Sequence, residues 1–330
     1  MIISRTPFRI SFFGGGTDYP AWFRRNGGAV VSTSINKYCY ITCRYLPPFF
    51  EHKSRILYSK IENVHSHDEI EHPAVRAILK ERGVEEGVEI HHDGDLPART
   101  GLGSSSAFAV GLLHALSALK STAAAKMQLA LEAIHIEQEV LRENVGCQDQ
   151  VIAALGGFRR IDFRADGEVQ TSPITLSPER LELLQNHLLL YFTGFSRIAS
   201  QIAKEQIDRI PDKTKELKTM CEMVDESIRL LEGSENLDGF GRLLDEGWKL
   251  KRGLSSKIST PQTDEAYAAA KSAGALGGKL LGAGGGGFMV FFARPEDHPR
   301  IQERLKGLLR VPVRFETGGT QIIFQQHGSS

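Results

Sequence analysis

The fold and chemistry of this chain follow from one stretch, Leu96-Pro97-Ala98-Arg99-Thr100-Gly101-Leu102-Gly103-Ser104-Ser105-Ser106-Ala107. Glycines let backbone N–H groups turn toward an anion without a Cβ in the way. The first turn of a helix adds unpaired N–H groups and the positive end of the helix dipole. Apolar residues then recur at helical spacing, at Phe108, Leu112, Leu113 and Leu116. The stretch therefore predicts a phosphate-binding loop that runs into a helix.

Two better-known phosphate motifs do not describe this loop. The chain contains no GxxxxGKS/T sequence, and residues 101–105 do not match GxGxxG, so neither a P-loop nor a dinucleotide-binding fold is expected. A serine at such a helix start can offer its hydroxyl to Mg²⁺, and Ser105 is the candidate, with Ser104 one residue away. The competing interpretation is a tight turn whose Ser104 merely caps the helix.

Two carboxylates follow the loop, and their spacing places both near one end of a second predicted helix. Glu137 lies on a second predicted helix, from Met127 to Leu141, and Asp149 comes after Gly146, which should end that helix. Phosphoryl transfer needs a carboxylate to hold Mg²⁺ and a group to accept or orient the hydroxyl proton. Glu137 suits the first role and Asp149 the second. The alternative is that both are ordinary exposed helix carboxylates.

The N-terminal segment predicts a strand that feeds a glycine turn. It reads Pro7-Phe8-Arg9-Ile10-Ser11-Phe12-Phe13-Gly14-Gly15-Gly16-Thr17-Asp18. Asp18 can accept hydrogen bonds from two vicinal hydroxyls of a carbohydrate, and Arg9 offers a fixed positive charge to a phosphate or to a catalytic carboxylate. The competing interpretation is that Asp18 only stabilises the turn.

A second glycine run lies near the other end of the chain. Five of the six residues from Gly282 to Gly287 are glycine, and a strongly apolar strand follows. Because ordering so many glycines is entropically costly, a simple linker is disfavoured. We expect the run, with Gly284 and Gly285 at its centre, to approach a ligand or the opposite domain closely.

The remaining pattern predicts an α+β protein of two domains with a cleft between them. Its 330 residues exceed the usual size of a single core. Strand-like runs alternate with helical stretches, and the pattern changes near residue 185. We therefore expect one domain over 1–184 and a second over 185–330. The polar, proline-containing region 46–72 is predicted to be a surface connection.

Composition excludes several classes of protein. Forty Lys plus Arg balance forty Asp plus Glu, so no basic field for nucleic-acid binding is expected. The chain has no apolar run of signal-peptide length at its start and none of about 20 residues elsewhere, so we expect no membrane association. The four cysteines are predicted to be reduced thiols in the cytoplasm.

These motifs, in this order, resemble the GHMP kinases, named for galactokinase, homoserine kinase, mevalonate kinase and phosphomevalonate kinase. The segment Arg9 to Asp18 looks like the sugar-binding opening of galactokinase, Pro97 to Ala107 resembles the family's phosphate loop, and Gly282 to Gly287 matches its C-terminal glycine loop. One departure is Ser106, where the family often has alanine.

The resemblance implies a ribosomal-protein-S5-like N-terminal domain and a ferredoxin-like C-terminal domain, with ATP and a sugar between them. It implies Asp149 as the catalytic base, and Mg²⁺ held by Ser105 and Glu137. From its fixed positive charge, Arg9 is expected to support Asp149. The expected ATP contacts are Pro97, Gly101, Leu102, Gly103, Ser104, Ser105 and Ser106. The expected acceptor contacts are Thr17, Asp18, Gly284 and Gly285.

Within the family, the Gly-Gly-Gly-Thr-Asp and Gly-Cys-Gln-Asp-Gln segments most resemble the D-glycero-D-manno-heptose 7-phosphate 1-kinases. The expected partner is thus a small sugar or sugar phosphate, bound by a monomer or homodimer. Arg44, Arg99, Arg159 and Lys279 are candidate anchors for the sugar's own phosphate. The alternatives are a GHMP kinase for another small molecule and a sugar-binding regulator without catalysis.

Overall fold

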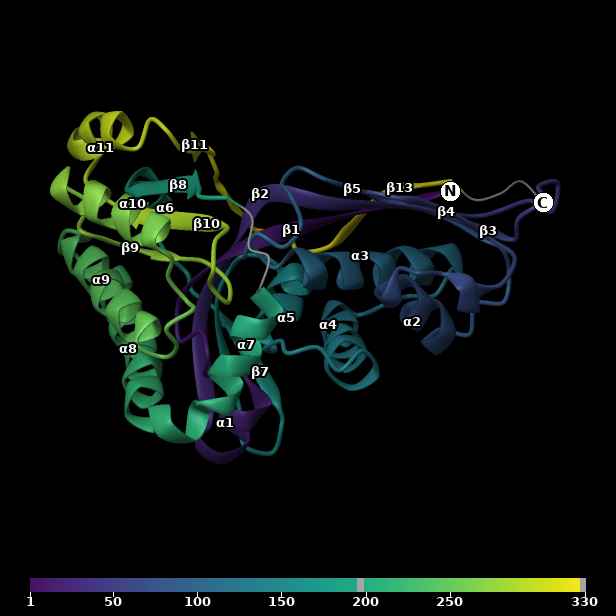
Figure 1. Cartoon of the computed structure of the whole chain (residues 1–330), viewed down its shortest axis with the longest axis horizontal. Coiled ribbons are helices and arrows are strands. Elements are labelled where there is room, and N and C mark those ends of the chain that lie inside the picture. The colour runs from purple at the N-terminus through teal and green to yellow at the C-terminus, as the bar shows by residue number, and fades with distance from the viewer. Residues whose placement is uncertain (195–198, 327–330) are drawn as a thin grey trace.

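The computed structural model describes residues 1–194 and 199–326. The chain forms two β-sheets, each covered by helices, and the helices α8 and α9 of one part pack against strands β1 and β2 of the other (Figure 1). This arrangement confirms the expected two-domain α+β fold.

The larger sheet is built around two long strands, β1 and β2. Its order is β13-β1-β2-β5-β3-β4, with β12 and β6 also pairing with β2, and β7 pairing with β6. Every pair is antiparallel except β3 with β5. The strands are β1 (Ile2–Phe13), β2 (Gly28–Tyr45), β3 (Ser54–Leu57), β4 (Ile61–Val64), β5 (Val88–Gly94), β6 (Phe158–Phe163), β7 (Val169–Pro173), β12 (Phe315–Glu316) and β13 (Gln321–Gln325).

Helices cover this sheet and carry the predicted phosphate loop. The central helix, α3, packs on β1 and β2 and is buried along most of its length. Its glycine-rich N-terminus therefore lies at the end of a largely buried helix. The helices are α1 (Pro20–Asn26), α2 (Pro73–Glu81), α3 (Ser104–Leu119), α4 (Lys126–His135) and α5 (Gln148–Leu155), with a 3-10 turn at His67–Glu69 and a π-helical turn at Ile136–Val140.

The smaller sheet has the order β11-β8-β10-β9 and is entirely antiparallel. Its strands are β8 (Leu188–Phe192), β9 (Gly277–Leu280), β10 (Phe288–Phe292) and β11 (Leu309–Arg310). The accompanying helices are α6 (Pro178–Asn186), α7 (Ala199–Asp208), α8 (Thr214–Glu232), α9 (Asp238–Arg252), α10 (Pro261–Ser272) and α11 (His298–Arg304), with 3-10 turns at Ile210–Lys213 and Pro295–Asp297.

Three details differ from the sequence-based expectation. The predicted strands at 29–35 and 38–45 form the single strand β2, because the pairing with β1 absorbs the polar residues between them through a register shift. The region 46–72 is more than a connection, since β3 and β4 add a hairpin whose side chains alternate between buried and more exposed positions. The terminal strands β12 and β13 pair with the first sheet, although they lie within the range predicted as the second domain.

The two parts share an aromatic core. Phe240 on α9 contacts Phe12 and Phe13 at the end of β1, with ring centroids 5.6 and 5.2 Å apart, and Phe292 on β10 at 5.6 Å. All four rings are buried. The end of β1, which leads into the predicted sugar-binding turn, is thereby fixed against the second sheet. No helix in residues 1–194 and 199–326 combines the length and the apolar character needed to span a bilayer.

Candidate active site

An ion pair between Arg9 and Asp149 lies at the centre of the predicted site. Nε and Nη2 of Arg9 donate to the two carboxylate oxygens of Asp149 at 2.7 and 2.6 Å. The Arg9 side chain is 5% exposed and that of Asp149 is 24% exposed, so the carboxylate reaches the surface and the guanidinium lies behind it. Bidentate pairing of this kind fixes the orientation of the carboxylate.

Arg9 also connects the ion pair to the phosphate loop. Its Nη1 donates to Gly101 O at 2.6 Å, and its backbone N–H donates to Leu102 O at 3.1 Å. A Cβ at Gly103 would lie only 3.3 Å from Arg9 Cγ and from Asp149 Oδ2. Gly103 has a φ of 76° and immediately precedes α3. Residues from β1, α5 and the start of α3 therefore meet at one point.

The start of α3 offers donors for an anion. Its first capping bond runs from Ala107 N–H to Gly103 O at 2.9 Å, so the N–H groups of residues 104–106 have no partner within the helix. The Ser104 hydroxyl accepts a hydrogen bond from Arg99 N–H at 3.1 Å, whereas Ser105 is exposed. The turn before the loop is closed by Thr100, whose hydroxyl donates to Pro97 O at 2.8 Å.

Glu137 is buried beside this helix start. Its Oε2 accepts hydrogen bonds from Ser106 Oγ at 2.8 Å and from Gln150 Nε2 at 2.6 Å. It lies in the π-helical turn that continues α4, a local structure often associated with functional sites. Burial raises the pKa of Glu137 to about 7, although the hydrogen bonds from Ser106 and Gln150 oppose the shift. The carboxylate is thus a poorly compensated buried charge.

The donor set fits a magnesium ion that shares its coordination with phosphates. Mg²⁺ is usually held by one or two carboxylates, with phosphate oxygens and water completing the shell. Glu137 supplies one carboxylate, and the Ser105 hydroxyl is among the groups that lower its pKa. The described residues contain no group of three or more His, Cys, Asp or Glu side chains that could hold a metal alone. The hydroxyl that donates to Glu137 at 2.8 Å belongs to Ser106.

Asp18 lies in the glycine turn after β1 and is 3% exposed. Oδ1 accepts from Gly16 N–H at 2.9 Å, and Oδ2 accepts from Gln148 Nε2 at 3.1 Å. Burial raises the pKa of the Asp18 carboxyl, the bond from Gly16 opposes this, and the negative charge of Asp149 adds to it. Gly146 leaves room for this carboxylate, because a Cβ there would lie 1.8 Å from Oδ2. Asp18 therefore stabilises its own turn and also joins Asp149 at the site.

Thr17 has a mainly structural environment. It is fully buried, and its hydroxyl oxygen lies 2.8 and 2.9 Å from the carbonyl oxygens of Gly14 and Ala29. These contacts tie the glycine turn to the start of β2. A contribution of Thr17 to acceptor binding would be indirect, through the position of Asp18.

The two glycine loops meet across the domains. A Cβ at Gly282 would lie 2.4 Å from Gly101 Cα, and one at Gly287 would lie 2.3 Å from Thr100 O. Phe288 N–H also donates to Thr100 O at 3.1 Å. The predicted approach of the distal glycine run to the opposite domain is therefore present. Its central residues face the second domain, since Gly285 N–H donates to Ile258 O at 2.9 Å and a Cβ at Gly284 would lie 2.8 Å from Ile258 Cα.

The predicted phosphate anchors are mostly engaged elsewhere. Arg44 pairs with Glu89, Arg159 Nε donates to Gly156 O at 2.6 Å, and Lys279 Nζ donates to Phe12 O at 2.8 Å. Arg99 adopts a positive φ of 61° next to the phosphate loop. Of these four candidates, Lys279 is the buried one, and the charges of Arg9 and Asp18 both affect its pKa.

Three polar residues at the site were not predicted from the sequence. Gln148 and Gln150 flank Asp149, and this position beside a candidate base was the available signal. Lys251 lies in the last turn of α9, about a hundred residues away from Asp149, and no motif marks it. Only the fold brings its buried ammonium group toward Arg9, Asp18 and Asp149.

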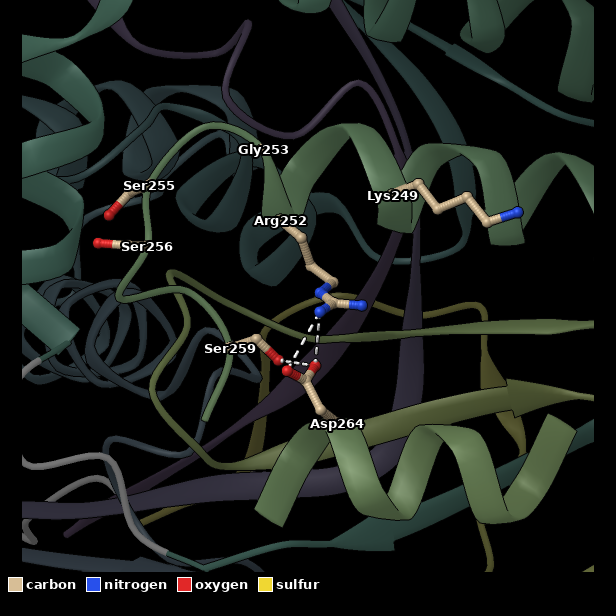
Figure 2. A pocket seen from close by; sticks show the side chains of 7 residues that line it. All are labelled: Lys249, Arg252, Gly253, Ser255, Ser256, Ser259 and Asp264. Atoms are coloured by element: carbon tan, nitrogen blue, oxygen red, sulfur yellow. Dashed lines mark hydrogen bonds and ion pairs between the residues drawn. The ribbon is translucent and has the colours of Figure 1, made fainter. Parts of the chain in front are cut away.

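Two surface cavities lie away from this constellation. One, of about 360 Å³, is lined by Lys249, Arg252, Gly253, Ser255, Ser256, Ser259 and Asp264. In Figure 2, Arg252 reaches Asp264, which also accepts from Ser259, while Lys249 points away. The other, of about 610 Å³, lies between α1 and the end of α7. Neither cavity is lined by Asp149 or by residues 101–106. The candidate site is therefore defined by the polar groups that meet at the start of α3.

Two family models match the chain where these features lie. The model of the GHMP kinases N terminal domain matches residues 69–157, which include the phosphate loop, Glu137 and Asp149. The model of the GHMP kinases C terminal matches residues 226–310, which include Lys251 and the second glycine loop.

Individual relatives extend over nearly the whole chain. A D-glycero-alpha-D-manno-heptose 7-phosphate kinase from Campylobacter jejuni is 28% identical over 311 residues, covering 89% of this chain and 90% of that protein. A galactokinase from Thermotoga neapolitana is 24% identical over 342 residues, covering 94% and 95%. A solved D-glycero-D-manno-heptose 1-phosphate kinase from Bacteroides thetaiotaomicron superposes with a TM-score of 0.78 at 24% identity, covering 99% and 100%. The last comparison supports the fold.

Proposed function

Because the chain belongs to the GHMP kinases, a family of phosphotransferases, we propose that it is an ATP-dependent sugar kinase acting on the anomeric hydroxyl of a sugar phosphate. The proposed acceptor is D-glycero-D-manno-heptose 7-phosphate, and the product is the 1,7-bisphosphate. The 28% identical C. jejuni relative supports this choice. A cytoplasmic monomer or homodimer belongs to the same proposal.

The observation that carries the proposal is the position of Asp149. Its carboxylate is held by Arg9 and lies against Gly103, where the unpaired amides of α3 begin. A base beside an anion cradle is the arrangement that phosphoryl transfer to a hydroxyl requires. An ordinary exposed helix carboxylate would have no reason to be oriented by a buried guanidinium.

In the proposed reaction, Asp149 accepts the proton of the acceptor hydroxyl as its oxygen attacks the γ-phosphorus. The new O–P bond forms while the bond from the γ-phosphorus to the β–γ bridging oxygen breaks, and ADP leaves. The amides of residues 101–106 bind the phosphates, and Arg9 keeps the base in position. When bound, Mg²⁺ would neutralise phosphate charge, held by Ser105 and Glu137. Asp18 positions acceptor hydroxyls, with Gln148 beside it.

A panel of acceptors tests this function. Purified protein with MgATP would be assayed for ADP release with heptose 7-phosphate, fucose, galactose, mannose and mevalonate, and the product would be identified by ³¹P NMR. We expect the highest kcat/KM with heptose 7-phosphate and a new anomeric phosphate signal. If another acceptor gives a higher kcat/KM, that acceptor would replace heptose 7-phosphate as the proposed substrate. Saturable sugar binding without ADP release for any acceptor would favour the catalytically silent regulator.

A further inference from the structure

Lys251 is a buried cation that the proposed mechanism leaves unused. It lies in the last turn of α9 and is 8% exposed. Its Nζ donates to Leu280 O at 2.9 Å and to Gly282 O at 2.5 Å, where β9 passes into the distal glycine loop. Two carbonyl acceptors are the number that a neutral amine, with two N–H groups, can satisfy.

No carboxylate lies within ion-pair distance of Lys251 among the residues that the structure describes. The charged groups that face it are Arg9 from β1, Asp18 from the glycine turn, Asp149 from α5 and Lys279 from β9. Asp149 is already engaged by Arg9, and Lys279 is a second buried cation. The cluster Arg9, Lys251 and Lys279 thus carries more positive charge than Asp18 and Asp149 can balance.

This imbalance leaves Lys251 easy to deprotonate in the free protein. Burial, together with the charge of Arg9, lowers the pKa of Lys251 to about 7, although the charges of Asp18 and Asp149 oppose the shift. Burial likewise lowers the pKa of Lys279, helped by Lys251 and Arg9. A buried ammonium without a counter-ion releases its proton, and an anion placed nearby restores it.

The loop where a phosphate would bind lies next to the glycine loop that Lys251 contacts. Gly282, whose carbonyl accepts from Lys251, packs against Gly101 at the entrance of the phosphate loop. Any phosphate cradled by residues 101–106 therefore lies on the other side of a glycine contact from the amine. Leu280, Leu281 and Lys251 are all buried, so screening by solvent is reduced on the side of the contact where the amine lies.

We propose that Lys251 takes up a proton when a phosphate group binds at the loop of residues 101–106, so that an ammonium charge appears behind the distal glycine loop. The proton comes from the solvent and forms a third N–H on Nζ, and the two bonds to Leu280 O and Gly282 O remain. Lys251 is a positioning residue, because it acts through the glycine loop. The nature of the ligand rests on the proposed function, whereas the proton uptake does not depend on turnover.

Calorimetry tests the proposal directly. Binding of the magnesium complex of AMP-PNP would be measured at pH 8 in two buffers of different ionisation enthalpy, which gives the number of protons taken up. The wild type should take up close to one proton at pH 8, and this uptake should shrink as the pH falls through 7 to 6. The control Lys249→Met lies on the same helix, is exposed and pairs with Asp245, and it should behave like the wild type.

Two variants remove the titrating amine in different ways. Lys251→Met has no charge and Lys251→Arg has a permanent one, so both should lose the uptake at pH 8, and the arginine should retain more affinity. The ionisation of the ligand itself is common to all variants and cancels in the difference from Lys249→Met. Unchanged uptake in either variant, uptake that Lys279→Met alone abolishes, or wild-type uptake that does not fall by pH 6 would overturn the proposal.

Separate titrations distinguish the source of the phosphate. Uptake with the nucleotide alone assigns the partner of Lys251 to the nucleotide, and uptake only with heptose 7-phosphate assigns it to the acceptor. If neither the nucleotide nor heptose 7-phosphate causes proton uptake, the inference is overturned. If uptake occurs with the nucleotide but no acceptor is phosphorylated, the kinase proposal fails and the protonation of Lys251 stands.

Discussion

At the scale of single residues, the three glycines before Thr17 differ in what requires them. Gly14 and Gly16 have positive φ values of 78° and 104°, whereas Gly15 does not. A Cβ at Gly14 would lie 1.9 Å from Ala29 O, but one at Gly15 would meet only Ser11 Oγ at 3.7 Å and Gln148 Nε2 at 3.8 Å. The protein can accommodate a side chain at position 15, and we propose that the acceptor occupies this space.

This contrast gives a matched pair of variants. Gly14→Ala should destabilise the protein by at least about 1–2 kcal/mol, because a left-handed backbone strains any residue with a Cβ. Gly15→Ala should leave the midpoint of urea unfolding nearly unchanged but raise the KM for the sugar several-fold, with the KM for ATP unaffected. An unchanged sugar KM in folded Gly15→Ala would remove this position from the acceptor site.

Glu137 provides a prediction about pH. Its pKa of about 7 in the folded protein lies above the ordinary value of 4.5, so folding favours the protonated form. Ionisation of Glu137 therefore lowers the stability of the folded protein as the pH rises from 4.5 to 7. Glu137→Gln avoids this loss, because glutamine does not ionise. We expect the metal-free variant to be more stable than the wild type by roughly 3 kcal/mol at pH 8, with the difference vanishing below about pH 4.5.

Mg²⁺ supplies the control for this prediction. MgADP should raise the melting temperature of the wild type more than that of Glu137→Gln, since the variant lacks the carboxylate proposed to hold the ion. An equal gain in both proteins would argue against Glu137 as a magnesium ligand.

At the scale of elements, the contact between the glycine loops depends on missing side chains from both domains. Gly282 has a φ of 72° and faces Gly101 without space for a Cβ. Gly282→Ala should therefore push the loops apart and raise the KM for ATP about tenfold or more, because the phosphate site and the carbonyl held by Lys251 both move. Gly307→Ala is the control, since nothing lies within 4 Å of its Cβ position.

Much of the element order could be predicted from the sequence, and the reasons for the failures are physical. The helix at 104–119 and the strands at 188–192 and 288–292 have strong periodic or continuous apolar patterns. The hairpin of β3 and β4 was missed because short edge strands such as Ile61–Val64 mix buried and charged residues. The π-helical turn at Glu137 was not predictable, since it depends on how the end of α4 packs rather than on propensity.

Site residues divide in the same way. Arg9, Asp18 and Asp149 lie in glycine-containing motifs, and the structure places them together as expected. Lys251 lies in an ordinary amphipathic helix, and only tertiary packing brings it to the site. The hydrogen bond from Ser106 to Glu137 also required coordinates, because three successive serines look equivalent in the sequence.

At the scale of the whole molecule, Phe240 joins the two sheets through Phe12, Phe13 and Phe292. Phe240→Ala should cost about 3–5 kcal/mol, as expected for a large buried aromatic ring. Because the cavity would lie between the sheets, the unfolding of both parts should shift together in a guanidinium titration. Phe49→Ala, at a position 90% exposed, should leave the midpoint unchanged. Separate transitions for the two parts would show that their cores are independent.

We propose that Asp149 is the base of a phosphoryl transfer, and single-turnover kinetics of Asp149→Asn would reveal the loss of this base. With the preferred acceptor at saturation, the rate of ADP formation should fall by about 10²–10⁴-fold while AMP-PNP and sugar still bind. Glu139→Gln, an exposed carboxylate on the π-helical turn, should keep the wild-type rate. A folded Asp149→Asn protein that turns over at a near-normal rate would show that Asp149 is not the base.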